Sequence, residues 1–145
     1  MIKNEKQYRI TKAQVRRFQD AIGELDGQSR PTNIGARLWE AQRDAALSQL
    51  HELRTEVEAY ERLDAGRSKA VVLEAVEDLP KALIRARIAS GMTQEGLARR
   101  LGIKPQQVQR YEATDYESAS FARILKVVKA LGLTMPRAVR LVRNG

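Results

Sequence analysis

The sequence predicts an all-α protein, in which a long helical N-terminal region is followed by a compact domain of short helices. Strand signals are scarce, since the only β-branched cluster is "AVVL" at residues 70–73. Elsewhere apolar residues recur every three to four positions, which is the period of an amphipathic helix. Glycines stand at the breaks between these periodic segments, where helices commonly end.

The N-terminal region, residues 1–65, is expected to hold two helices. Thr11 is interpreted as the N-cap of the first, because apolar residues step by three and four from Val15 to Leu25. A loop rich in turn-forming residues follows at 26–33. The second helix is predicted over residues 34–63, a length of about 45 Å at 1.5 Å per residue. It would therefore be longer than the first helix by about four turns.

The longer predicted helix carries a seam for a partner helix. Its apolar residues recur at heptad spacing and at the three- and four-residue steps between. One possible partner is the first helix, folded back as a hairpin, which the short loop favours. The other is the same helix of a second subunit, which would cover the excess length. The candidates for dimerisation are Trp39, Ala46, Leu50, Leu53, Val57 and Tyr60.

Residues 66–78 are expected to be a linker and residues 79–145 a second domain. Asp78 is the expected N-cap of its first helix, with Pro80 tolerated in the first turn. The predicted helices span residues 79–90, 94–101, 105–113, 119–131 and 135–142. Their expected stops are Gly91, Gly102 and Gly132, and their expected N-caps are Thr93, Ser118 and Thr134.

The apolar positions of the second domain form one inward-facing set. Val108 is expected to anchor the helix over 105–113 from its inner face, so the polar residues of this helix point away from the core. Those outward residues are Gln106, Gln107, Gln109 and Arg110. The inward set comprises Leu83, Ile84, Ile88, Met92, Leu97, Ala98, Leu101, Ile103, Val108, Tyr111, Ile124, Leu125, Val128 and Leu131.

Positive charge is concentrated in the second half of the chain. Residues 1–80 hold 13 Lys and Arg against 14 Asp and Glu, whereas residues 81–145 hold 13 against 4. The net charges are thus −1 and +9, which together give the +8 of the whole chain. A basic domain joined to a neutral region is typical of proteins that bind a polyanion. A basic surface that serves only solubility is the alternative.

The outward residues of helix 105–113 suit the reading of DNA bases. A glutamine amide can donate to and accept from the edge of adenine, and arginine can donate two hydrogen bonds to guanine. The alternative is an ordinary surface helix, since Gln and Arg are also good helix formers. The helix–glycine–helix context favours recognition of double-stranded DNA, because the second helix of such a pair enters the major groove.

The segment "ARIASGMTQEGLARRLGIKPQQVQRYEATDYESASFARILKVVKALGL" resembles the Cro/cI-type helix-turn-helix domain of the Xre family of repressors. The resemblance covers about residues 79–134. It implies a five-helix, lambda-repressor-like DNA-binding domain and a function as a transcriptional regulator. The residues in register are Arg87, Thr93, Gln94, Leu97, Ala98, Leu101, Gly102, Val108, Glu112, Leu131 and Gly132.

The resemblance also implies roles for particular residues. Arg87 and Glu112 would form a buried ion pair. Gln94 would bind the DNA backbone and support the recognition helix, which is the helix over residues 105–113. Pro105 departs from the pattern, because it cannot donate a hydrogen bond to a base and could offer only an apolar contact to a thymine methyl group. The base-contact candidates are Pro105, Gln106, Gln107, Gln109 and Arg110, and the backbone candidates are Thr93, Gln94, Arg99, Arg100, Lys104 and Arg123.

A narrower similarity concerns the helical extension together with "LIRARIASGMTQ" and "QRYEATDYESAS". This combination is similar to Xre regulators of the HigA antitoxin kind. It implies an alternative function, in which the N-terminal helices bind and neutralise a small toxin protein while the domain represses its own operon. The helix-turn-helix domain is common to antitoxins and plain repressors and does not choose between them.

No enzyme, cofactor or metal site is expected. The only histidine, His51, lies in the middle of a predicted helix, and the chain has no cysteine. Single-stranded RNA readers usually expose aromatic side chains. Tyr111 is expected in the core, which leaves Tyr116 as the one candidate in the basic half.

The helix-turn-helix reading predicts a homodimer on a palindromic operator, with half-sites about 34 Å apart. No membrane segment is expected, and the predicted location is the cytoplasm, at the nucleoid.

Overall fold

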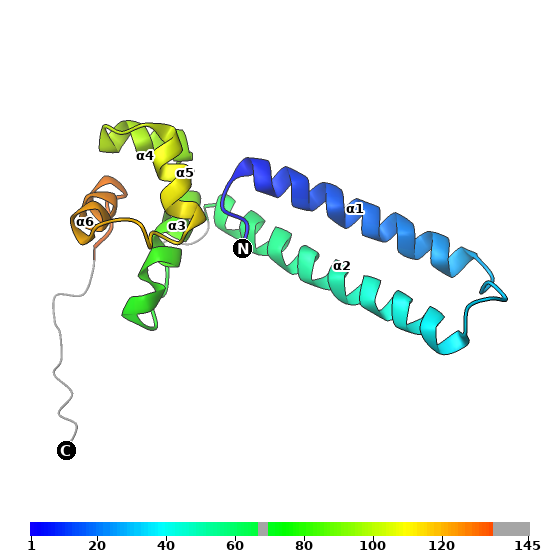
Figure 1. The fold of residues 1–145 in the computed structure, drawn as a ribbon. Coiled ribbons are helices and arrows are strands. Elements are labelled where there is room, and N and C mark those ends of the chain that lie inside the picture. Colours follow the sequence, from blue (N-terminus) through cyan, green and yellow to red (C-terminus); the bar gives the residue numbers. More distant parts are fainter. Residues whose placement is uncertain (67–69, 135–145) are drawn as a thin grey trace, which may run out of the picture. The chain divides into compact units, whose positions relative to one another are not determined.

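The computed structural model describes residues 1–66 and 70–134, and in this part of the chain the regular structure is entirely helical (Figure 1). The predicted all-α class is therefore confirmed, and the β-branched residues 70–73 form no strand. Backbone contacts group the chain into two compact units, residues 1–93 and residues from Gln94 onward. The helix predicted over 135–142 lies outside the described residues. The first unit contains α1 (Glu5–Gly27), α2 (Ala36–Asp64), the 3-10 turn η1 (Val76–Asp78) and α3 (Leu79–Ala89), and the second contains α4 (Gln94–Leu101), α5 (Pro105–Ala113) and α6 (Phe121–Ala130).

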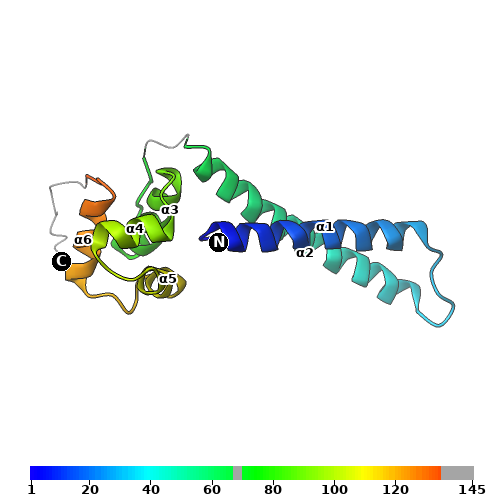
Figure 2. The ribbon, with the colours of Figure 1, turned by 90° about the horizontal axis from the view of Figure 1, so that it is seen from above.

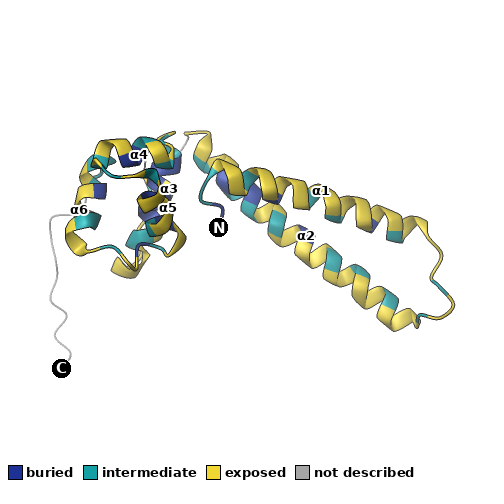
Figure 3. Cartoon of the chain, turned by 45° about the horizontal axis from the view of Figure 1, so that its top comes forward, coloured by how far each residue is buried: buried dark blue, intermediate teal, exposed yellow. Residues whose placement is uncertain are grey.

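Helices α1 and α2 pack against each other as an antiparallel hairpin (Figure 1, Figure 2). Near the start of α1 the rings of Tyr8 and Tyr60 stack with centroids 5.0 Å apart. Near its end, Nε of Arg43 lies 2.6 Å from Oδ1 of Asp26. The seam of α2 is therefore directed at α1, and Leu50, Val57 and Tyr60 of this seam are buried inside the hairpin (Figure 3).

Helix α1 begins at Glu5, so the prediction of Thr11 as its N-cap was wrong. The side chain of Asn4 accepts a hydrogen bond from the Gln7 amide at 2.9 Å, and the Gln7 side chain accepts one from the Lys3 amide at 2.8 Å. The first bond satisfies an amide that the first helical turn would leave unpaired, and the second ties the residue before the cap to the same turn. Thr11 is instead buried within the helix.

The earlier start of α1 nearly equalises the two helices of the hairpin. Helix α1 has 23 residues and α2 has 29, so α2 is longer by six residues. Six residues make less than two turns, not the four turns expected from the sequence. The excess length of α2 consequently gives no support for a second subunit.

Helix α3 follows Asp78, as predicted, and has Pro80 in its first turn. The Asp78 carboxylate does not cap α3, however, because it accepts a hydrogen bond from the amide of Ala75 at 3.1 Å and so closes η1. Arg87 is buried on α3, and its guanidinium donates to the carbonyl oxygens of Met92 at 2.8 Å and Lys3 at 2.5 Å. The first residues of the chain are thereby held to α3.

Three predicted helix stops are confirmed. Gly91, Gly102 and Gly132 have φ angles of +66°, +65° and +65°, the left-handed region that costs glycine nothing. After each glycine, the next amide bonds back to a carbonyl five residues earlier, as Ile103 does to Ala98 at 3.1 Å. This is the Schellman arrangement of a helix C-terminus.

Two expectations for α6 were wrong. Its N-cap is Ser120 rather than Ser118, since the Ser120 hydroxyl accepts from the Arg123 amide at 3.2 Å. Leu125, expected in the core, is 51% exposed, whereas Val127 is fully buried. With Val127 at the centre of the inward stripe, Leu125 lies about 160° away, because successive residues turn by about 100° around a helix.

Candidate nucleic-acid interface

A tight turn joins α4 to α5 and holds the two helices together. Leu97 and Ala98 of α4 are 0% and 1% exposed, so α4 presents a small, fully buried face to its neighbours. Gly102 ends the helix in the left-handed conformation, and Lys104, in extended conformation, precedes the first residue of α5. Pro105 occupies the first turn of α5, where its missing amide hydrogen is not required. The result is a short helix–turn–helix with helix bounds as predicted.

Helix α5 has one buried and one exposed face. Val108 and Glu112, one turn apart, are 1% and 0% exposed. Gln106, Gln107, Gln109 and Arg110 are exposed, as expected from the sequence, whereas Pro105 is half-buried. The exposed face therefore presents three amides and one guanidinium, and every one of these groups can donate hydrogen bonds.

An open hollow lies beside the exposed face of α5. Its lining comes from the turn and from α5 as far as Arg110, and it contains two cationic side chains, two amides and no carboxylate. The lining residues are Gly102, Ile103, Lys104, Gln106, Gln107 and Arg110. Cations can contact phosphate and amides can contact base edges, so both kinds of DNA contact are available on one surface.

A buried carboxylate connects the start of α4 with the end of α5. Glu112 Oε2 accepts a hydrogen bond from the side-chain amide of Gln94 at 2.8 Å. Gln94 is the first residue of α4 and Glu112 lies in the last turn of α5, so this bond fixes the two helices of the motif relative to each other. The ion pair expected between Arg87 and Glu112 stays a prediction; both residues are buried, at 3% and 0% exposure.

The candidate backbone cations differ in what they already contact. Arg99 faces Glu95 at 3.7 Å on the exposed side of α4. Arg100 donates to the carbonyl oxygen of Ala130 at 2.9 Å and so caps the C-terminal end of α6. Lys104 is exposed at the edge of the hollow, and Arg123 is half-buried near the start of α6. Thr93 is exposed just before α4.

The burial of the two tyrosines of the second unit is the reverse of the expectation. Tyr116 is 2% exposed, whereas Tyr111 is only half-buried, and their rings stack with centroids 6.1 Å apart. Asp115 and Tyr116 have φ angles of +47° and +61°, and the Tyr116 amide donates to the carbonyl of Tyr111. Helix α5 thus ends in the same Schellman arrangement as its neighbours, without a glycine. Tyr116 is therefore not the exposed aromatic that an RNA reader would need, whereas Phe121, another aromatic residue of the basic half, is 70% exposed at the start of α6.

The described part of the chain lacks two further structural features. None of its helices is both long and apolar enough to cross a bilayer. Residues 1–66 and 70–134 also hold no cluster of three or more His, Cys, Asp or Glu side chains placed to bind a metal ion. His51 lies exposed on α2.

Comparison with known proteins identifies the region that contains this interface. The helix-turn-helix family model matches residues 83–137, a range that includes α4, the turn and α5. No match was found among curated proteins or among solved structures. The match and the geometry of α4 and α5 agree on the same residues. The chain therefore contains a helix-turn-helix DNA-binding domain of the Cro/cI type.

Proposed function

We propose that the protein is a transcriptional repressor that recognises a specific sequence in double-stranded DNA, with α5 in the major groove. The observation that carries this proposal is the division of α5 into two faces. Val108 and Glu112 are buried, while four polar side chains stand exposed on the other side. A helix held in this way by its inner face can enter the groove without disturbing the core.

The exposed side chains of α5 are suited to different bases. Gln106 can make paired hydrogen bonds to adenine, and Arg110 can donate two to guanine. Both line the hollow, as does Gln107, so all three can reach the same short stretch of DNA. Pro105, half-buried at the start of the helix, could contribute only an apolar contact to a thymine methyl group. Gln109 is the remaining exposed candidate.

The experiment is a comparison of two glutamine variants on DNA selected from a random double-stranded pool. Gln106→Ala removes one amide from α5, whereas Gln19→Ala removes one from an exposed position of α1. The first variant is expected to lose about 1–3 kcal/mol of discrimination at one or two base pairs of the selected site. The second should bind every site as the unchanged protein does.

Base substitutions in the selected site supply the measurement, by titration of each variant with a labelled duplex. If Gln106→Ala and Arg110→Ala both keep the original preference at every position, α5 does not read the bases. A pool that yields no preferred sequence at all would contradict sequence-specific recognition.

The antitoxin alternative rests on the resemblance of the N-terminal extension. Within the described residues, no contact of the hairpin favours capture of a toxin over a plain repressor. The repressor is therefore the function proposed.

A further inference from the structure

The residues that precede α1 are held to α3 at a buried arginine. Ile2 is only 3% exposed, and the carbonyl oxygen of Lys3 accepts a hydrogen bond from Nη2 of Arg87 at 2.5 Å. Arg87 itself is 3% exposed, so water has little access to its guanidinium. We call residues 2–4 the N-terminal strap. A buried side chain and a hydrogen bond to a buried charge therefore hold the strap in place.

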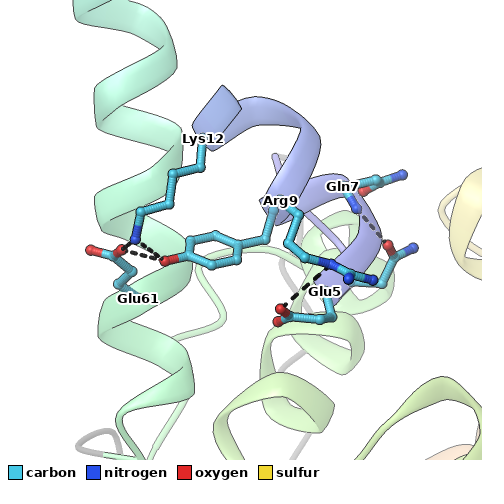
Figure 4. A network of polar contacts seen from close by, with 7 residues as sticks. Glu5, Gln7, Arg9, Lys12 and Glu61 are labelled. Carbon is cyan, nitrogen blue, oxygen red and sulfur yellow. Dashed lines mark hydrogen bonds and ion pairs between the residues drawn. The ribbon is translucent and has the colours of Figure 1, made fainter. Parts of the chain in front are cut away.

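The strap leads directly into the first turn of α1. The Gln7 amide donates to the Asn4 side chain at 2.9 Å, and this bond caps the helix (Figure 4). The Lys3 amide donates to the Gln7 side chain at 2.8 Å. These bonds fix the direction in which the strap leaves the helix. The hairpin thus supplies Arg87 with an acceptor, the Lys3 carbonyl.

Arg87 uses a second nitrogen for the turn that leads into α4. Its Nη1 donates to the Met92 carbonyl at 2.8 Å. The Met92 amide donates in turn to the Arg87 carbonyl at 3.1 Å, so Met92 is bound to Arg87 through both its amide and its carbonyl. Met92 stands two positions before Gln94, the first residue of α4. Arg87 therefore fixes the last part of the chain before α4.

One rigid group connects the strap with this turn. A guanidinium is planar, so the nitrogens that bond Lys3 and Met92 keep a fixed separation and cannot move independently. If the strap detaches, an N–H of this buried group loses its acceptor, which is unfavourable. The side chain then shifts to recover a partner, and its bond to the Met92 carbonyl is weakened. The strap and the turn are in this way coupled energetically.

The strap and the arginine that it contacts come from different parts of the sequence. The helix-turn-helix family model covers residues 83–137, which include Arg87 and Met92 but not the strap. An arginine of the DNA-binding region thus takes an acceptor from the N-terminal extension. This arrangement gives the extension a route by which it can influence the DNA-binding helices.

We propose that the N-terminal strap positions Arg87 for DNA binding, and that the affinity for DNA falls when the strap is displaced. The inference rests on the proposed function of α5. With the strap in place, Arg87 holds the turn before α4. Without it, α4 follows a looser turn, and the helix-turn-helix is less well ordered for the groove. A partner that binds the start of the hairpin and displaces the strap would thereby favour release of the DNA.

The test compares three isoleucine-to-alanine variants of the full chain. Ile2→Ala removes the buried side chain that anchors the strap. Ile22→Ala removes a side chain of α1 that is 8% exposed, so it also creates a cavity in the hairpin but leaves the strap intact. Ile10→Ala removes a side chain that is 51% exposed. A general loss of hairpin stability would affect the first two variants alike, whereas loss of the strap affects only the first.

Hydrogen exchange without DNA measures the turn directly, at a temperature where every variant is folded. In Ile2→Ala the amides of residues 90–93 should exchange about tenfold faster, the effect of losing one hydrogen bond to a charged group on a local opening. The two controls should exchange there as the unchanged protein does. Unchanged exchange of residues 90–93 in Ile2→Ala, or an equal rise in Ile22→Ala, overturns the proposal.

Titration with the duplex selected from the random pool measures the consequence for binding. Ile2→Ala should bind at least about fivefold more weakly, and the two controls should bind as the unchanged protein does. Each variant is titrated below its melting transition, so lower stability alone does not change the affinity. Equal affinities of Ile2→Ala and the unchanged protein overturn the coupling while the proposed function stands. A pool that yields no preferred duplex contradicts the proposed function, and the exchange rates alone then decide whether the strap holds the turn.

Discussion

Among the residues that the structure describes, two charged side chains are buried, and both are hydrogen-bonded. Arg87 donates to the carbonyls of Lys3 and Met92, and Glu112 accepts from Gln94. A buried charge is tolerated only when it is paired or hydrogen-bonded. Arg87 therefore fixes the first residues of the chain, and Glu112 fixes the angle between the two helices of the DNA-binding motif.

Substitution of Arg87 tests its part in stability. Arg87→Ala should lower the free energy of unfolding by roughly 3–5 kcal/mol if Glu112 is its ionic partner, because a buried carboxylate is then left uncompensated. Urea denaturation of the full chain gives the value. Arg85→Ala removes an exposed arginine of the same helix and should change stability by less than about 0.5 kcal/mol. Equal stabilities of the two variants would contradict the ion pair.

At this scale the sequence predicted the orientation of α5 but not the burial of Tyr111 and Tyr116. The helical period, with Val108 as anchor, was sufficient to place the four exposed polar residues. Tyr111 and Tyr116 were assigned the wrong way round because the chain turns back at Asp115 and Tyr116 with positive φ. Glycine is the usual sign of that conformation, and here neither residue is glycine.

The sequence shows where these helices end more clearly than it shows where they begin. Gly102 and the other two glycine stops were predicted correctly because glycine is the natural residue for the left-handed conformation. The start of α1 was missed, although Asn4 followed by Gln7 fits the spacing of a capping box. Thr11 was preferred because it precedes the most regular apolar steps. The start of a helix depends on two or three polar contacts, and apolar periodicity does not report them.

Two glycine substitutions should have opposite effects. Gly23 lies inside α1 and a Cβ there would meet no atom within 4 Å, so Gly23→Ala should stabilise the protein by about 0.5–1 kcal/mol. A Cβ at Gly102 also meets nothing, but its φ of +65° makes Gly102→Ala destabilising by about 1 kcal/mol. Melting temperatures of the two variants check the signs. A rise in both would mean that the α4–α5 turn does not require glycine.

At the scale of the molecule, the sequence predicted the all-α class and the helix-turn-helix from periodicity and glycine placement. It left two partners open for the long helix and favoured the hairpin because the loop between the two helices is short. It did not predict which ion pairs bridge the two helices of the hairpin, such as that between Lys12 and Glu61 (Figure 4). These pairs depend on the register of α1 against α2, which apolar periodicity alone does not fix. The pairs Lys12–Glu61 and Asp26–Arg43 became visible only once this register was known.

These pairs make the hairpin sensitive to acid. Hydrogen bonds from the Tyr8 hydroxyl and the Lys12 ammonium lower the pKa of Glu61 from its usual 4.5. A hydrogen bond from Arg43 lowers the pKa of Asp26 from 3.8. Because both are lower in the folded state, their stabilising effect is complete above the ordinary pKa values and is lost as the pH falls through the lowered ones.

A double variant, Glu61→Gln with Asp26→Asn, tests the acid sensitivity. Its melting temperature should lie below that of the unchanged protein at about pH 6, and the difference should shrink at about pH 3. The effect is small because the pairs are exposed, and salt should reduce it. The control, Glu58→Gln with Asp20→Asn, alters two other exposed carboxylates of the hairpin. A difference that is constant with pH would show that the pairs contribute nothing electrostatic.

Salt dependence of DNA binding tests the expected phosphate contacts. Lys104→Ala should weaken binding to specific and unrelated duplexes alike and reduce the slope of log K against log salt by about 1. Lys6→Ala, on the exposed side of α1, should leave the slope unchanged. Lys104 suits this test better than Arg100, because Arg100 also has a structural role through its hydrogen bond to the Ala130 carbonyl. Equal slopes for all three proteins would remove Lys104 from the contacts.

The position of the single tryptophan has a practical consequence for spectroscopy. Trp39 lies in the first turn of α2, half-buried, and belongs to the first of the two compact units. Its emission therefore follows the hairpin, whereas far-ultraviolet circular dichroism averages over all helices. Coincident melting curves from the two signals would indicate one cooperative transition. Separate curves would show that the hairpin and the DNA-binding helices unfold independently, so each signal would then monitor a different event.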